Sequence, residues 1–169
     1  DEYYVLDGNH RIAAAKELPP EQQTAMIKGM VERLAERLGK DGEVLYSSID
    51  GLIHPEYSPV FRSIESLYHV GIVYGRRAFI DGQTGTRSTQ EVLLIDVRYM
   101  NQTLLNEFKH GLFEEFGVQS HLHEHLWEYE QYLRVAPPAI AALKALGVTR
   151  GRTTIVAHEF MGMPTALAA

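Results

Sequence analysis

The chain has 169 residues, of which 22 are acidic and 16 basic, giving a formal net charge of -6. A hydrophobic fraction of 45% and a charged fraction of 22% indicate a globular domain rather than a disordered chain. The acidic balance argues against a general binder of nucleic-acid backbones, and the absence of cysteine excludes disulfides and thiolate metal sites.

The hydropathy, the cysteine content and the two ends of the chain give expectations about its location and its completeness. No apolar run is long enough to cross a membrane, and we expect neither a membrane partner nor a signal peptide. A chain without cysteine is compatible with a reducing cytoplasm, which is the location we expect. Because it begins with Asp1 rather than methionine and ends in an apparent helix, we expect it to be a piece of a longer protein.

The first predicted elements are a strand and a helix joined by a polar turn. Tyr3–Leu6 has the composition of a strand, and the alanine-rich segment from Arg11 to Leu18 has helical spacing. The turn between them ends at a helix N-terminus, which favours anions. Its polar residues are Asp7, Asn9, His10 and Arg11.

This stretch resembles the DGxHR-xxAA motif of ParB-type partition proteins and sulfiredoxin-like domains. In that superfamily the matching residues contact nucleotide phosphates, so the resemblance implies that His10 and Arg11 contact phosphate, with Asp7 and Asn9 beside them. We assign residues 1–20 to this ParB-like motif, which is either functional or the remnant of a domain. The alternative is a polar turn that only caps its helix.

Helices and strands alternate in the next part of the chain. A stripe of methionine and leucine predicts an amphipathic helix over Glu21–Leu38, and Val44–Ser47 has a short strand pattern. The stretch after that strand is expected to be irregular. Further strands are predicted at Val70–Tyr74 and Glu91–Val97, and the glycine-containing loop 81–88 between them predicts a hairpin with a long tip.

The segment from Val70 onward resembles the eukaryotic-type glycogen synthases and their archaeal relatives. The family pattern V-x-Y-G-R-x-x-I-x-G, followed by V-x-L-I-D, is matched by Val73, Tyr74, Gly75, Arg76, Ile80 and Gly82, then by Val92, Leu94, Ile95 and Asp96. The segment Asn106–Gly117 resembles the K-x-x-L-W-E-x-F-G helix of that family, and Gly117 is its expected stop.

A histidine-rich segment follows this helix. His121, His123 and His125 alternate along the chain, with Glu124 and Glu128 close to them. Alternating histidines can share one face of a strand and bind zinc, whereas in a helix His121 and His125 would share a face. The alternative, a solvated loop before the next helix, needs no metal, and we expect none.

The next predicted helix, from Trp127 to Leu146, contains two consecutive prolines, Pro137 and Pro138. Proline removes a helical hydrogen bond and clashes with the preceding turn. The pair therefore predicts a kink or two separate helices.

The end of the chain carries the predicted active residues. Thr154–Ala157 is a short apolar run typical of a buried parallel strand, and His158 and Glu159 follow it directly. After Gly162, Pro164 suits the first position of a helix. Polar residues past the carboxyl end of such a strand often bind ligands. The alternative is an ordinary turn with one hydrogen-bonded histidine.

This turn is similar to the H-x-H-[DE]-W-x-[AT]-G turn of the glycogen and starch synthases. With the earlier matches, the likeness covers about residues 70–169. It implies an α/β fold with three layers and a mostly parallel Rossmann-like sheet, as in the N-terminal lobe of a GT-B enzyme. We assign residues 21–169 to such a domain, incomplete at its C-terminus.

The resemblance implies a hexosyltransferase that moves a glucosyl unit from a nucleotide-sugar donor, ADP-glucose or UDP-glucose, to an α-glucan acceptor. His158 would stabilise the transition state, with Glu159 as its partner, and Arg76 and Gly162 would bind substrate. No metal or other cofactor is implied. Because the second lobe is absent, the fragment alone is expected to be inactive. The competing hypotheses are a ParB-like nucleotide-binding or nuclease-like module built on Asp7–Arg11, and a non-catalytic structural or interaction domain.

Overall fold

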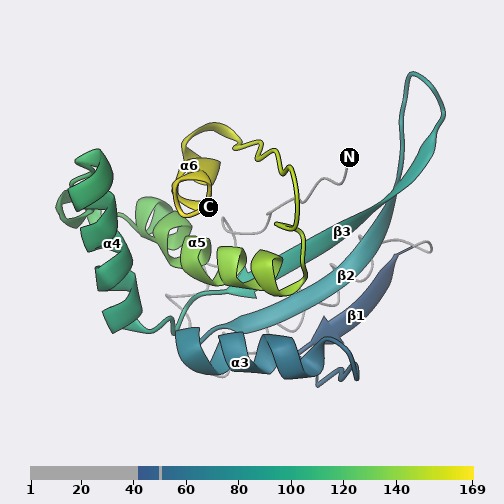
Figure 1. Ribbon diagram of the computed structural model, residues 1–169, viewed down its shortest axis with the longest axis horizontal. Coiled ribbons are helices and arrows are strands. Elements are labelled where there is room, and N and C mark those ends of the chain that lie inside the picture. The colour runs from purple at the N-terminus through teal and green to yellow at the C-terminus, as the bar shows by residue number, and fades with distance from the viewer. Residues whose placement is uncertain (1–41, 50) are drawn as a thin grey trace. The chain divides into compact units, whose positions relative to one another are not determined.

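In a computed structural model of the protein, the chain is described for residues 42–49 and 51–169 (Figure 1). The described part of the chain divides into two compact units. The first comprises residues 42–49 and 51–58 together with Gly71–Leu94, and the second comprises Pro59–Val70 and Ile95–Ala169. Among the described residues, no helix is long and apolar enough to span a membrane.

The first unit is built on a three-stranded sheet in the order β1-β2-β3 (Figure 1). The strands are β1 (Glu43–Ser47), β2 (Gly71–Ile80) and β3 (Arg87–Asp96), whose last two residues belong to the second unit. β1 pairs antiparallel with β2. β2 and β3 are hydrogen-bonded neighbours joined by a short loop, so they form an antiparallel hairpin as the sequence predicts.

The prediction of a mostly parallel, Rossmann-like sheet in three layers is wrong. Parallel neighbours need a crossover connection of about a dozen residues or more, usually a helix. Here β2 ends at Ile80 and β3 begins at Arg87, so the connection permits only antiparallel pairing. Buried parallel and antiparallel strands have the same apolar runs in sequence, so the runs do not show the direction of pairing. The parallel direction came from the resemblance to a GT-B lobe, and it was wrong.

A β-bulge in β1 faces a glycine in β2. Val44 pairs with Gly75 and Tyr46 with Tyr74, so Leu45 is an extra residue on β1. A Cβ atom at position 75 would overlap the backbone carbonyl of Glu43. Only glycine therefore allows the two backbones to approach this closely, and Gly75 continues β2 instead of ending it as the sequence suggested.

The second unit is helical. Its elements are α3 (Ser58–Tyr68, with Ser58 itself in the first unit), α4 (Gln102–Phe116), the 3-10 helix η1 (Ser120–His123), α5 (Trp127–Ala145) and α6 (Glu159–Leu167). The sequence did not anticipate α3, because Pro55 and Pro59 suggested an irregular stretch. Proline is nevertheless tolerated in the first turn of a helix, where backbone N–H groups have no helical partner, and Pro59 lies there.

Specific caps define both ends of α4. The Asn101 side chain accepts a hydrogen bond from the backbone N–H of Thr103 at 3.0 Å. The Asn101 N–H donates to Tyr68 O at 2.8 Å, which ties the start of α4 to the end of α3. At the other end Gly117 adopts φ 69° and its N–H donates to Phe113 O at 2.8 Å, which confirms the predicted stop.

α5 contributes more buried residues than any other element of the second unit. It runs unbroken through Pro137 and Pro138, so the predicted kink or division into two helices is wrong. The helix continues because tertiary packing outweighs the local cost of proline. Its buried apolar residues include Tyr132, Leu133, Val135, Ala136, Pro138, Ala139, Ile140 and Ala142. α6 lies beside α5, with the rings of Tyr132 and Phe160 in edge contact at 5.8 Å (Figure 1).

The predicted buried strand at Thr154–Ala157 is also wrong. This segment has no regular secondary structure, and Ile155 and Val156 are 46% and 77% exposed. A strand requires a hydrogen-bonded neighbour, and the sheet of the structure comprises β1, β2 and β3 alone within the described residues. α6 begins at Glu159, so Pro164 lies inside the helix rather than at its first position.

Candidate functional site

His158 and Glu159, the predicted catalytic pair, lie at the start of α6. His158 is the N-cap residue with an extended backbone, and its side chain makes no capping hydrogen bond. Both side chains are exposed. An exposed imidazole next to an exposed carboxylate can meet a ligand from solvent. The segment that precedes the pair is not a strand, so the two residues do not follow the carboxyl end of one as the sequence predicted.

The backbone of Glu159 is unusual. Its φ of 51° lies in the left-handed region, which residues other than glycine rarely adopt. Such a conformation costs on the order of 1–3 kcal/mol and is most often retained at functional sites, where the surrounding structure holds it in place. The strain therefore falls at one of the two residues that the sequence predicted to be catalytic.

Gly162, predicted to bind substrate, has a packing role in this turn. Its N–H donates to His158 O at 3.2 Å. A Cβ atom at position 162 would come within 2.8 Å of the Ala157 Cα, closer than real Cβ contacts allow. Glycine is thus needed so that the chain before α6 can fold back against the helix.

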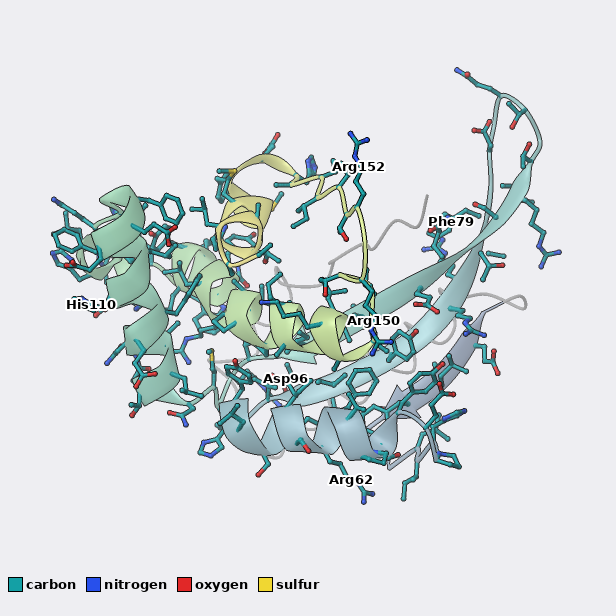
Figure 2. All side chains as sticks on the ribbon, in the orientation of Figure 1. Arg62, Phe79, Asp96, His110, Arg150 and Arg152 are labelled. Carbon is teal, nitrogen blue, oxygen red and sulfur yellow. The ribbon has the colours of Figure 1, made fainter. Side chains whose placement is uncertain are left out.

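Arg76, the other predicted substrate-binding residue, belongs to the first unit. It lies on β2, and its guanidinium is 3.5 Å from the Glu91 carboxylate on β3. Its side chain is 43% exposed, so this pair is solvated and contributes little to stability. Two other arginines, Arg150 and Arg152, lie on the exposed segment that leads to α6 in the second unit (Figure 2).

The remaining candidates are the phosphate contacts and the histidine-rich segment. The predicted phosphate contacts are outside the described residues: Asp7, Asn9, His10 and Arg11. Of the histidine-rich segment, His121 and His123 lie in η1 and His125 in the turn after it, all exposed. Among the described residues, no group of three or more histidine or carboxylate side chains is arranged to hold a metal ion.

The structure reveals a charged cluster that sequence reasoning missed. Lys109 on α4 is 7% exposed, and its Nζ lies 2.8 Å from Oε2 and 3.0 Å from Oε1 of Glu130 on α5. The same ammonium donates to Glu124 Oε1 at 3.0 Å. Arg134, one helical turn beyond Glu130, approaches its Oε1 at 3.4 Å. The i,i+4 spacing of Glu130 and Arg134 indicates an ion pair on one helix from the sequence alone. No local pattern marks Lys109 as buried.

No protein-family model, curated protein or solved structure matches the chain. The likenesses to ParB-type proteins and to glycogen synthases therefore depend on the motifs in the sequence alone.

Proposed function

We propose that the protein is a nucleotide-binding module in which His10 and Arg11 contact the phosphates. The observation that carries this proposal is the sequence Asp7-Gly8-Asn9-His10-Arg11 between a strand pattern and an alanine-rich helix pattern. A helix N-terminus presents free backbone N–H groups to an anion, and a guanidinium adds bidentate donors for phosphate oxygens. Asp7 and Asn9 complete the polar turn.

The corrected fold is the reason for preferring this function over glucosyl transfer. Rossmann-like sheets bind ligands in a crevice at the carboxyl ends of parallel strands. The described sheet is antiparallel and has no such edge. The ParB-like motif does not depend on a parallel sheet, so the correction leaves it unaffected.

The test is binding of ATP and CTP to the whole chain, measured by titration calorimetry. We expect Arg11→Ala to weaken binding roughly tenfold to a hundredfold, because a hydrogen bond to a charged group is lost. Arg62→Ala is the matched control, since Arg62 is an exposed arginine on α3 (Figure 2). Equal affinities of the Arg11 and Arg62 variants, or no nucleotide binding by the unaltered chain, would remove the proposal.

Glucosyl transfer is the second candidate, favoured by one observation, the left-handed backbone of Glu159 next to His158. Transfer from ADP-glucose or UDP-glucose to an α-glucan builds positive charge on the anomeric carbon and negative charge on the leaving diphosphate. A positioned imidazole and carboxylate can stabilise the charge that develops on the sugar.

This candidate is tested in the full-length protein by following the release of ADP or UDP with glycogen as acceptor. We expect His158→Ala to lower turnover by about two orders of magnitude or more if the imidazole acts in the transition state. His69→Ala is a suitable control, because His69 is another exposed histidine with positive φ, of 53°. Unchanged turnover of the His158 variant excludes that residue from the mechanism.

A further inference from the structure

A cavity of about 330 Å³ opens between α4 and η1 in the second unit. This volume falls at the lower end of the range of small-molecule sites. The apolar part of the lining comes from Phe113 and Val118, and the polar part includes Lys109, Glu124 and two histidines. One of these histidines, His110, is marked on α4 in Figure 2. The cavity therefore combines an apolar wall with a buried ammonium.

The buried charges behind the cavity do not cancel by themselves. Lys109 and Arg134 both approach the same carboxylate, that of Glu130. Their side chains are 7%, 14% and 6% exposed, so water screens them little. Two cations and one carboxylate leave one positive charge in excess.

Glu124 supplies the missing negative charge from the side of the cavity. Its Oε1 lies 3.0 Å from Lys109 Nζ, yet its side chain is 51% exposed. The residue follows η1 in a turn, not in a regular helix. A half-exposed carboxylate regains its hydration when it swings outward, so its contact with Lys109 is weakly held. Glu130 is buried and cannot regain hydration in this way.

From this geometry, we propose that the cavity is a binding site for a small monocarboxylate with an apolar body, and that Glu124 occupies it as an internal competitor. The ligand carboxylate replaces that of Glu124 on Lys109 Nζ, and the apolar body lies against Phe113 and Val118. The exchange is one negative charge for another, so the balance with Lys109, Arg134 and Glu130 is preserved. A dianion such as phosphate would leave one negative charge in excess. This site is independent of the proposed nucleotide contacts.

The test uses the whole chain and four probes at constant ionic strength: butyrate, butanol, butylamine and inorganic phosphate. Binding is followed by NMR titration of backbone amides. We expect butyrate to bind most tightly and to shift the amides of Val118 and Ser120, which line the cavity. Tighter binding of butylamine or phosphate than of butyrate at this site overturns the proposal, and so does the absence of butyrate binding.

Glu124→Gln tests the internal competitor. If Glu124 occupies Lys109 for about nine-tenths of the time, its removal strengthens butyrate binding about tenfold. Glu115→Gln is the matched control, because it removes the same charge from an exposed position on α4. Butyrate affinity that is unchanged or weaker in the Glu124 variant, or equally increased in both variants, overturns the proposal.

A second variant tests the cation. Lys109→Met removes the ammonium and leaves Glu130 paired with Arg134 at 3.4 Å, so the buried carboxylate keeps a cationic partner. We expect this variant to be folded by circular dichroism and to lose butyrate binding. Retained binding in a folded variant overturns the role of Lys109. If the variant does not fold, the comparison of the Glu124 and Glu115 variants decides alone.

Discussion

Lys109 and Glu130 show how much a single residue depends on its partner. Both side chains lie almost wholly out of water, where an ion pair must offset a large loss of hydration. Such a pair adds little net stability compared with apolar residues of the same shape. The loss of Glu130 is costly, because it leaves Lys109 with the half-exposed Glu124 alone and takes from Arg134 the carboxylate that it approaches.

We therefore expect Glu130→Ala to lower the free energy of unfolding by about 3–5 kcal/mol. The measurement is urea denaturation at neutral pH. Glu115→Ala is the control, since an exposed carboxylate on α4 should matter by no more than about 0.5 kcal/mol. If the two variants unfolded at the same urea concentration, the pair would have no structural importance.

At the tip of the β2–β3 hairpin, Asp81 gives a prediction about pH. Its Oδ1 accepts hydrogen bonds from the backbone N–H groups of Thr84 at 2.7 Å and Gln83 at 2.8 Å. These bonds hold the pKa of the Asp81 carboxyl below its ordinary value of 3.8, and the bond from Thr84 has the larger effect. A lowered pKa in the folded chain means that ionised Asp81 stabilises the turn. This contribution is complete above pH 3.8 and is lost as the pH falls through the lower, folded pKa.

The prediction is checked by NMR titration of the Asp81 carboxyl carbon in the intact protein. We expect a midpoint below 3.8, with the amide shifts of Gln83 and Thr84 changing in the same range. In Asp81→Asn the side-chain oxygen still accepts both bonds, so these two amides should lose their acid transition while the turn persists. A midpoint at or above the ordinary value would contradict the geometry of the turn.

At the scale of elements, the features that the sequence predicted correctly have local causes. The hairpin followed from two apolar runs around a glycine-containing loop, and the end of α4 followed from Gly117 after a helical pattern. The failures concern partners distant in the chain. Thr154–Ala157 has the composition of a strand, but composition cannot show whether a neighbouring strand is available. The Lys109–Glu130 pair could not be predicted from the sequence either, because its members are 21 residues apart and no local pattern joins them.

The close approach of β1 and β2 at Gly75 gives a prediction for a whole element. In Gly75→Ala the new methyl group would overlap the Glu43 carbonyl, so one backbone must move and the pairing beside the bulge must weaken. We expect a loss of about 1–3 kcal/mol in the free energy of unfolding, the usual cost of overpacking. Hydrogen exchange of β1 amides should accelerate more than that of α4 amides.

Gly82→Ala is the matched control for this change. A Cβ atom there meets nothing within 4 Å, and the residue is exposed in the hairpin tip. We expect the Gly82→Ala variant to have the same free energy of unfolding and the same hydrogen exchange of β1 amides as the unaltered chain. Equal effects of the two substitutions would mean that β1 does not approach Gly75 as closely as the structure indicates.

At the scale of the whole molecule, the chain passes between its two compact units three times: after Ser58, after Val70 and after Leu94. Two of these boundaries fall inside regular elements, near the start of α3 and near the end of β3. Neither unit is therefore a continuous stretch of chain with a free linker. Each unit is assembled from separate stretches of the described chain, and the stretches of one are joined by a stretch of the other.

We consequently expect the two units to unfold together. The single tryptophan, Trp127, lies at the start of α5 and reports on the second unit by its fluorescence. Hydrogen exchange of the β2 amides reports on the first unit. In urea, the loss of Trp127 fluorescence and the loss of β2 protection should occur at the same concentration, as a two-state transition requires. Separate midpoints would contradict this expectation and show that each unit is stable by itself.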